Sequence, residues 1–135
     1  MKSLKLTVPA QTITWQGEEE KPGGSLDIEA AVHTVNGSLT VGRSEGCGFR
    51  LNLPALSRRQ CEITFDGELA QIRDLGSRNG TLVNGKAIEV GPFQVLNDGD
   101  EIKVVEVAIR VSLVDESRTD AGPGTIVLDG PTIVG

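Results

Sequence analysis

The chain has 135 residues, of which 38% are hydrophobic and 24% are charged, and its formal net charge is −6 at pH 7. This length and composition are typical of one globular domain with a hydrophobic core, and they exclude a disordered chain. The acidic balance and the 3% aromatic content argue against a protein that binds nucleic acid through its phosphates or its bases. No run approaches the roughly 18 apolar residues of a membrane span, and the basic N-terminus lacks the apolar segment of a secretory signal. We therefore expect a cytoplasmic protein without a membrane span.

Residues 1–24 contain two strand candidates followed by a charged, glycine-rich run. Apolar and polar residues alternate over 4–8, Pro9 interrupts the pattern, and 12–15 forms the second candidate. Residues 16–24 lack aliphatic and aromatic side chains, which predicts a loop or linker. We interpret 1–24 as an N-terminal extension that carries extra strands.

Residues 25–114 show short alternating segments separated by turn signals. The candidate strands cover 26–30, 39–41, 49–53, 61–65, 69–75, 87–90, 93–96 and 102–113. No apolar stripe of helical spacing persists for ten residues, so this pattern predicts an all-β sandwich domain. The alternation changes parity at Val104–Val105, which predicts either a bulge or a tight reversal between two strands. Residues 115–135 lose the alternation and are predicted to be a flexible tail or linker.

Catalysis, metal binding and a cofactor are not expected. His33 is the only histidine, so the serines have no plausible triad partner, and the sequence has no phosphate-binding P-loop. His33, Cys47 and Cys61 make a poor zinc set because they are few and distant in sequence. Cys61 opens an alternating run, and we interpret it as a small buried hydrophobe and not as a disulfide partner.

Two Asn-Gly pairs, Asn79-Gly80 and Asn84-Gly85, lie close together in the middle of the chain. Each pair favours a tight turn with positive φ, so residues 81–83 between them can form only a very short strand. The residues just before the first turn, Ser77 to Asn79, therefore lie on a rigid, exposed corner. Loops on a stiff scaffold are where binding residues concentrate.

The arginines are concentrated in the same region of this acidic chain. The arginines of interest in the middle of the chain are Arg43, Arg58, Arg59, Arg73 and Arg78. A local basic site suits a small anion, and a phosphate group favours a guanidinium fork beside a hydroxyl donor. In a sandwich, the loops that carry Arg43, Ser57 and Asn79 would converge at one end. Taken singly, these residues also fit plain roles as strand or turn caps.

In combination, four blocks have the order and spacing of a known family. They are Gly42-Arg43, Ser57-Arg58-Arg59-Gln60-Cys61, Gly76-Ser77-Arg78-Asn79-Gly80-Thr81 and Asn84-Gly85. Over about residues 26–114 the chain resembles the forkhead-associated (FHA) domain, and 97–100 is similar to that family's late turn. The resemblance implies a β-sandwich of about eleven short strands that binds phosphothreonine peptides through loops at one end.

The resemblance also implies roles for individual residues. Arg43 would contact the phosphate, Ser57 would donate its hydroxyl to it, and Arg58 would add a second positive contact. Asn79 would hold the peptide backbone, and Arg78 would flank the pocket for the residue three positions after the phosphothreonine. Eight further residues would support these loops: Gly42, Gln60, Gly76, Ser77, Gly80, Thr81, Asn84 and Gly85.

The chain departs from the family pattern at two positions. Gln60 stands where the family usually has a histidine that braces the phosphate-binding loop, and an amide can still donate and accept hydrogen bonds. Val105 stands where the family often has glycine in a turn. Gln60 therefore bears on how the phosphate-binding loop is held, and Val105 bears on the geometry of its own turn.

The leading hypothesis is a phosphothreonine-binding module that mediates protein–protein interaction in Ser/Thr kinase signalling, with such a kinase acting upstream. An alternative is a phospho-independent FHA-like assembly domain of a larger complex, which the presence of Arg43, Ser57 and Asn79 together disfavours. A carbohydrate-binding sandwich is a third class, and the scarcity of aromatic residues disfavours it.

Overall fold

The computed structural model describes residues 2–115, and these residues form thirteen strands and no helix. The strands are β1 (Lys2–Val8), β2 (Gln11–Trp15), β3 (Gly24–Ile28), β4 (Ala31–Val35), β5 (Gly37–Gly42), β6 (Phe49–Arg50), β7 (Cys61–Phe65), β8 (Ala70–Asp74), β9 (Leu82–Val83), β10 (Lys86–Ala87), β11 (Gln94–Leu96), β12 (Glu101–Val104) and β13 (Val107–Asp115). Across this part of the chain there is no helix suited to crossing a bilayer. Of the predicted tail only Asp115 is described, as the last residue of β13, and residues 116–135 lie outside the described residues.

Eleven of the strands form two sheets, as the all-β prediction requires. The larger sheet has six strands in the order β10-β9-β12-β13-β1-β4, and the smaller has five in the order β11-β8-β7-β5-β6. Alternation places one face of each strand in a continuous core, as in β1, β7 and β13, where every second side chain is buried. The predicted sandwich of about eleven short strands is confirmed. β2 and β3 form a separate two-stranded hairpin.

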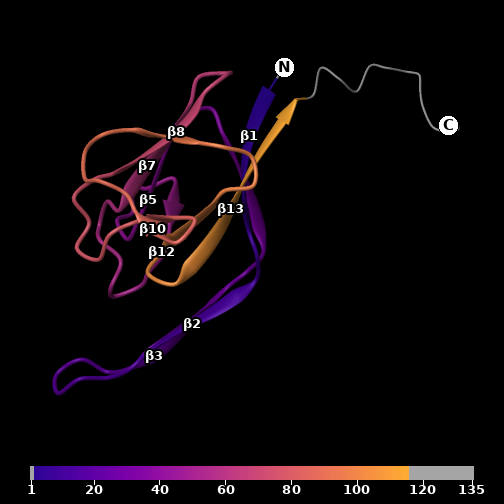
Figure 1. Cartoon of the computed structure of the whole chain (residues 1–135). Coiled ribbons are helices and arrows are strands. Elements are labelled where there is room, and N and C mark those ends of the chain that lie inside the picture. The colour runs from indigo at the N-terminus through magenta and orange to yellow at the C-terminus, as the bar shows by residue number, and fades with distance from the viewer. Residues whose placement is uncertain (1, 116–135) are drawn as a thin grey trace, which may run out of the picture.

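The N-terminal segment is part of the larger sheet. β1 lies between β13 and β4, with Lys2 opposite Asp115 and Val8 opposite Ala31. β1 therefore begins beside the end of β13, while the β2–β3 hairpin projects beyond the opposite end of the sandwich (Figure 1). The sequence analysis placed the start of the domain at residue 25. That boundary stays a prediction, and the structure adds that residues 2–8 are an internal strand.

Two predicted strands are shorter in the structure. Of 49–53 only Phe49–Arg50 is a strand, and 87–90 is replaced by Lys86–Ala87. The Leu51 N–H still donates to the Gly42 carbonyl of β5 at 2.9 Å, and beyond it the chain leaves the sheet in a local turn, in which the Leu53 N–H donates to the Leu51 carbonyl at 2.9 Å. Residues 51–56 then bury leucines at 51, 53 and 56 within a loop, so apolar alternation here reflects burial without strand pairing.

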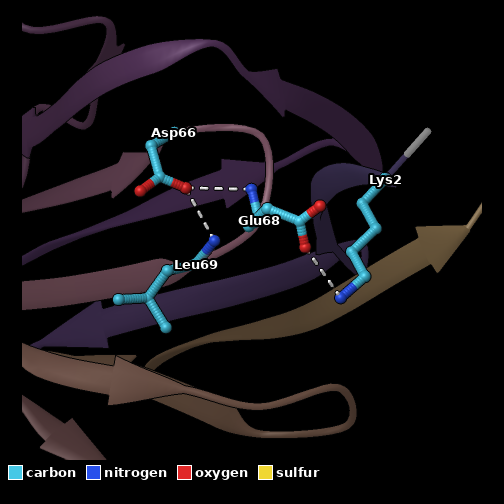
Figure 2. A network of polar contacts seen from close by, with 4 residues as sticks. All are labelled: Lys2, Asp66, Glu68 and Leu69. Carbon is cyan, nitrogen blue, oxygen red and sulfur yellow. Dashed lines mark hydrogen bonds and ion pairs between the residues drawn. The ribbon is translucent and has the colours of Figure 1, made fainter.

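The β7–β8 turn closes the end of the sandwich near the start of β1. A carboxylate oxygen of Asp66 accepts the N–H groups of Glu68 at 2.9 Å and Leu69 at 2.7 Å, and Gly67 takes φ +102° (Figure 2). The backbone bonds from Leu69 and then Glu68 lower the pKa of the Asp66 carboxyl. Lys2 pairs with Glu68 at 3.3 Å and so links β1 of one sheet to the β7–β8 turn of the other.

The parity change at Val104–Val105 is a tight reversal and not a bulge. Val104 pairs with Val107 across the β12–β13 hairpin, which leaves Val105 and Glu106 as the two turn residues. Their φ values are +47° and +77°, so both occupy the left-handed region without being glycine. This conformation is typical of the primed turns that connect hairpins, and it strains a β-branched residue most.

Candidate functional site

Three loops meet at the end of the sandwich from which the hairpin projects. They are residues 43–48 between β5 and β6, 51–60 between β6 and β7, and 75–81 between β8 and β9, here called the three-loop cluster. The Arg43 N–H donates to the Ser57 carbonyl at 3.0 Å, and the Ser44 N–H donates to the Arg58 carbonyl at 3.1 Å. The Arg78 N–H donates to Ser57 Oγ at 2.8 Å. The predicted convergence of the three loops is therefore observed.

Gly42 allows the first two loops to approach each other. A Cβ at Gly42 would overlap the carbonyl oxygen of Arg58 and lie 2.9 Å from Cys47 Sγ. The Cys47 thiol itself donates to the Arg58 carbonyl at 3.2 Å. Glycine is needed here because of this close backbone approach and not because of an unusual φ.

Gln60 is fully buried and joins the second loop to the third. Its Oε1 accepts the Ser57 N–H at 3.2 Å. Its Nε2 donates to the Gly80 carbonyl at 2.7 Å and to Thr81 Oγ1 at 3.3 Å. An amide that accepts at one atom and donates at the other fits this place between two loops. The contacts are those that a bracing residue would make.

Asp74 is a supporting residue that the sequence analysis missed. One carboxylate oxygen accepts the N–H groups of Gly76 and Ser77, both at 2.8 Å. The other accepts the hydroxyls of Ser77 at 2.5 Å and Thr81 at 2.7 Å. Burial alone would raise the pKa of Asp74, but these hydrogen bonds outweigh it and lower the pKa below its ordinary value. Asp74 thus fixes the shape of the third loop.

A sequence signal for Asp74 did exist. It occupies the inward-facing parity of β8, where alternate residues are buried, and it directly precedes Leu75-Gly76-Ser77. A carboxylate at an inward position requires donors, and a following Gly-Ser turn supplies them.

The predicted turn glycines have the expected geometry. Gly76 and Gly80 have φ of +84° and +83°, and the Asn84-Gly85 pair has +53° and +84°. The Asn84 side chain also donates to Asp100 Oδ1 at 2.9 Å and accepts the Glu101 N–H at 2.9 Å. It therefore ties the β9–β10 turn to the start of β12.

The polar side chains at the rim of the cluster are held by hydrogen bonds to backbone carbonyls of the second loop. Arg78 and Asn79 are exposed and reach across to the second loop, where Arg78 Nη2 donates to Pro54 O at 3.2 Å and Asn79 Nδ2 donates to Ala55 O at 2.7 Å. Arg43 is half-buried, and its Nε donates to the Leu56 carbonyl at 3.1 Å, which orients the guanidinium.

Three arginines of the cluster form no ion pair in the described part of the chain. Within residues 2–115, no ion pair involves Arg43, Arg58 or Arg78. Arg43, Arg58 and Arg78 thus place three cations on the loops that meet at Ser57, in a chain of net charge −6. Such a group of unpaired guanidinium groups is suited to binding a small anion.

Comparison with known proteins decides the family. A family model described as FHA domain matches residues 39–105. The solution structure of an FHA domain from Arabidopsis thaliana is 31% identical, covers 85% of this chain and 88% of that one, and superimposes with a TM-score of 0.60. The chain belongs to the FHA domain family.

Two further proteins are similar to this FHA domain over most of its length. A structure from a study of phosphothreonine-dependent FHA domain interactions is 29% identical, covers 84% of this chain and 98% of that one, and has a TM-score of 0.59. The human angiogenic factor with G patch and FHA domains 1 is 36% identical in an alignment of 114 residues that covers 76% of this chain. The match spans only 15% of that longer protein.

Arg73, which the sequence analysis grouped with the basic region, lies on β8 outside the three-loop cluster. Arg73 forms an ion pair with Glu62 at 2.7 Å, and its guanidinium lies 4.7 Å from the Phe93 ring centre. A hydrogen bond from Ser38 and the contacts from Arg73 lower the pKa of Glu62. Arg73 is therefore already neutralised within the smaller sheet.

The two cysteines and the histidine of this FHA domain are neither paired in a disulfide nor grouped to bind a metal ion within residues 2–115. Cys47 and Cys61 are both free thiols, and burial raises the pKa of Cys61 to about 12. His33 packs against Phe49 with ring centres 4.5 Å apart. Within residues 2–115 no group of three or more His, Cys, Asp or Glu side chains is arranged to hold a metal ion.

Proposed function

We propose that this FHA domain binds phosphothreonine peptides through its three-loop cluster and serves as a protein–protein interaction module in Ser/Thr kinase signalling. The observation that carries the proposal is that Arg43, Arg58 and Arg78, which form no ion pair within residues 2–115, lie on the loops that meet at Ser57 at one end of the sandwich. The structural relative with phosphothreonine-dependent interactions supports the choice of ligand. A Ser/Thr kinase acts upstream because it must make this ligand, and the proposal includes a cytoplasmic location.

The phosphate lies between Arg43, Ser57 and Arg58. Ser57 Oγ already accepts the Arg78 N–H, so its own hydroxyl hydrogen remains to donate to a phosphate oxygen. Arg43 uses Nε on the Leu56 carbonyl, and its two Nη groups remain for the ligand. Hydrogen bonds between guanidinium and phosphate are charge-assisted and are about twice as strong as neutral ones.

Asn79 and Arg78 act on the peptide that carries the phosphate. The Asn79 amide donates to Ala55 through Nδ2, which fixes its orientation and leaves Oδ1 to accept a peptide N–H. Arg78 extends the positive rim beyond the phosphate. The loops are held in place by Gln60 and Asp74 before a ligand arrives, so little ordering cost falls on binding.

The test is calorimetric titration with a degenerate phosphothreonine peptide library and with the same library unphosphorylated. We expect binding that depends on the phosphate, and we expect the protein to act by binding and not as an enzyme. If both libraries bind equally, the phospho-independent assembly role replaces the proposal. If neither binds while the protein is folded, the phosphate role of the cluster is wrong.

A further inference from the structure

The β2–β3 hairpin lies outside the residues that the FHA family model matches, 39–105. It continues the β1 and β4 strands beyond the sandwich and projects at the end of the molecule that carries the three-loop cluster (Figure 1). Its base is fixed to β13, because the Gln11 side chain donates to the Ala108 carbonyl at 3.2 Å and accepts the Ala108 N–H at 3.1 Å. Ile13 and Leu26 also pack against the core. The hairpin is therefore anchored to the fold.

A groove of about 590 Å³ separates the hairpin from the three-loop cluster. One wall includes Trp15 and Pro22, and the other includes Pro54, Ala55, Arg78 and Asn79. Arg78 and Asn79 belong to the proposed phosphopeptide site, so the groove continues directly from that site. Its size and its mainly apolar lining are typical of a pocket that receives apolar groups of a ligand.

Trp15 is the main apolar group of this groove. It pairs with Gly24 on β3, and a Cβ at Gly24 would lie 2.9 Å from the indole ring. The glycine therefore leaves space for the ring to lie across β3. Trp15 is half-buried, so part of the ring remains accessible to a ligand. A partly exposed tryptophan in a groove can anchor a binding partner because it buries a large apolar area.

The two ends of the groove have opposite charge. Arg78 lines the groove at the cluster end, and Arg43 and Arg58 lie on the same cluster of loops. At the hairpin end Glu18 and Lys21 line the groove and Glu19 and Glu20 lie exposed beside them, so the tip carries three glutamates and one lysine. Glu18 and Lys21 are joined by two backbone hydrogen bonds of 2.7 and 3.0 Å, which gives the tip a defined turn. A peptide that follows the groove thus meets positive charge, then an apolar middle, then negative charge.

We propose that the groove extends the peptide site and selects the residues on one side of the phosphothreonine. The preferred peptide has an apolar residue nearer to the phosphothreonine and a lysine or arginine farther from it on the same side. The inference rests on the proposed function, because the phosphate holds one end of the ligand. The apolar side chain packs on Trp15 between Pro22 and Pro54, and the cation lies beside the glutamates at the tip. The hairpin thereby supplies a specificity that residues 39–105 do not contain.

Intrinsic fluorescence tests the contact directly, because Trp15 is the only tryptophan and the chain has no tyrosine. A phosphothreonine library randomised on both sides first identifies the preferred peptide. That peptide should change the Trp15 emission on binding. The same peptide with its apolar residue replaced by glycine should still bind through the phosphate but leave the emission unchanged. If the library shows no apolar preference on either side, the inference is wrong.

Three variants separate this inference from the proposed function. Trp15→Ala should weaken the preferred peptide about tenfold, as expected for one buried apolar contact, and should not affect the glycine-substituted peptide. Ser25→Ala is the matched control on the same hairpin, because Ser25 is exposed and does not line the groove. Arg43→Ala should weaken both peptides.

A second hairpin variant guards against misfolding. In the tip-shortened variant, residues 16–23 are replaced by Asn-Gly, which keeps the Trp15–Gly24 pair and favours a two-residue turn. It should lose the preference for the basic residue and keep phosphate-dependent binding. If Arg43→Ala abolishes binding but both hairpin variants bind like the original, only the hairpin inference fails. If Arg43→Ala binds normally, the phosphate site fails first.

Discussion

At the scale of single residues, Arg43 is the most direct test of the phosphate site. Replacing Arg43 by Ala removes a charge-assisted donor that no carboxylate within residues 2–115 neutralises. We expect phosphopeptide affinity to fall at least tenfold, since such contacts contribute about 1.5–3 kcal/mol. Calorimetry should also show that Arg110→Ala, which removes an exposed arginine from β13, leaves affinity unchanged. Equal affinity for Arg43→Ala and the original would contradict the phosphate role.

A second prediction concerns Gln60 as the residue that holds the second loop against the third. Gln60→Ala removes a buried side chain with three hydrogen bonds and should lower the free energy of unfolding by about 2–3 kcal/mol. Phosphopeptide affinity should fall as well, because Ser57 loses its support. Gln60→His restores the residue that the family usually has there, and a neutral imidazole can accept from Ser57 and donate to Gly80. Chemical denaturation should therefore find Gln60→His more stable than Gln60→Ala, and the reverse order would refute the brace.

Because of Asp74, the free energy of unfolding should decrease as the pH falls into the acid range. Its pKa is lower in the folded protein than in the unfolded chain, so its stabilising contribution is present above the unfolded pKa of about 3.9. That contribution is lost as pH falls through the folded value. Asp74→Asn should cost about 2 kcal/mol at neutral pH, and the difference from the original should shrink below pH 4.

Asp66→Asn is the matched control, because Asp66 also has a lowered pKa but is exposed in a turn far from the site. Its effect on thermal unfolding at neutral pH should be smaller than that of Asp74→Asn. A difference between Asp74→Asn and the original that stays constant down to strongly acid pH would contradict the assigned cause.

How far the sequence predicts the site depends on whether a residue acts locally. The turn glycines and Asn84 were predictable, because positive φ is a local requirement that few residues meet. The donors to Asp74 lie only two to seven residues further along the chain, but Asp74 was missed because it is its buried, inward position on β8 that distinguishes it from an exposed turn aspartate. Arg73 was grouped with the site because sequence proximity does not reveal that Glu62, on the neighbouring strand, neutralises it.

At the scale of elements, the β12–β13 turn carries backbone strain that can be relieved. Glu106 is exposed and has φ +77°, a conformation that is costly for a residue with a Cβ. Glu106→Gly should raise the free energy of unfolding by about 0.5–1 kcal/mol. Glu89→Gly, at an exposed position without a positive φ, is the control and should be neutral or destabilising. Thermal unfolding of the two variants measures both effects, and a destabilised Glu106→Gly would show that the turn is not strained.

The strands themselves were predictable where alternation and pairing agree. β7 and β8 match their predicted ranges within a residue because the Asp66-Gly67 turn fixes a local hairpin. Residues 49–53 were wrongly assigned as a full strand, since alternation reports burial and does not show whether a partner strand is present. The place of β1 in the sheet was not predictable from its own residues, because its partners β4 and β13 are separated from it by intervening chain.

At the scale of the whole molecule, the position of β1 decides where the folding unit begins. Its inward side chains Leu4, Leu6 and Val8 are almost completely buried, and its backbone pairs with strands on both sides. Each such side chain contributes about 1.5–3 kcal/mol, and the total stability of a domain is only about 5–15 kcal/mol. We propose that the unit begins at β1, so that the domain cannot be cut at residue 25.

A chain that starts at Ser25 should therefore fail to fold. It would leave β4 and β13 without the strand that joins them and would expose the apolar core beneath β1. The tip-shortened variant keeps β1 and should remain folded, with a cooperative thermal transition by circular dichroism. The contrast matters because both variants lose the glutamate-rich tip, and only the shorter chain loses β1. If the chain from Ser25 unfolds cooperatively near the temperature of the original, β1 is dispensable and the N-terminal segment serves only to place the hairpin beside the peptide site.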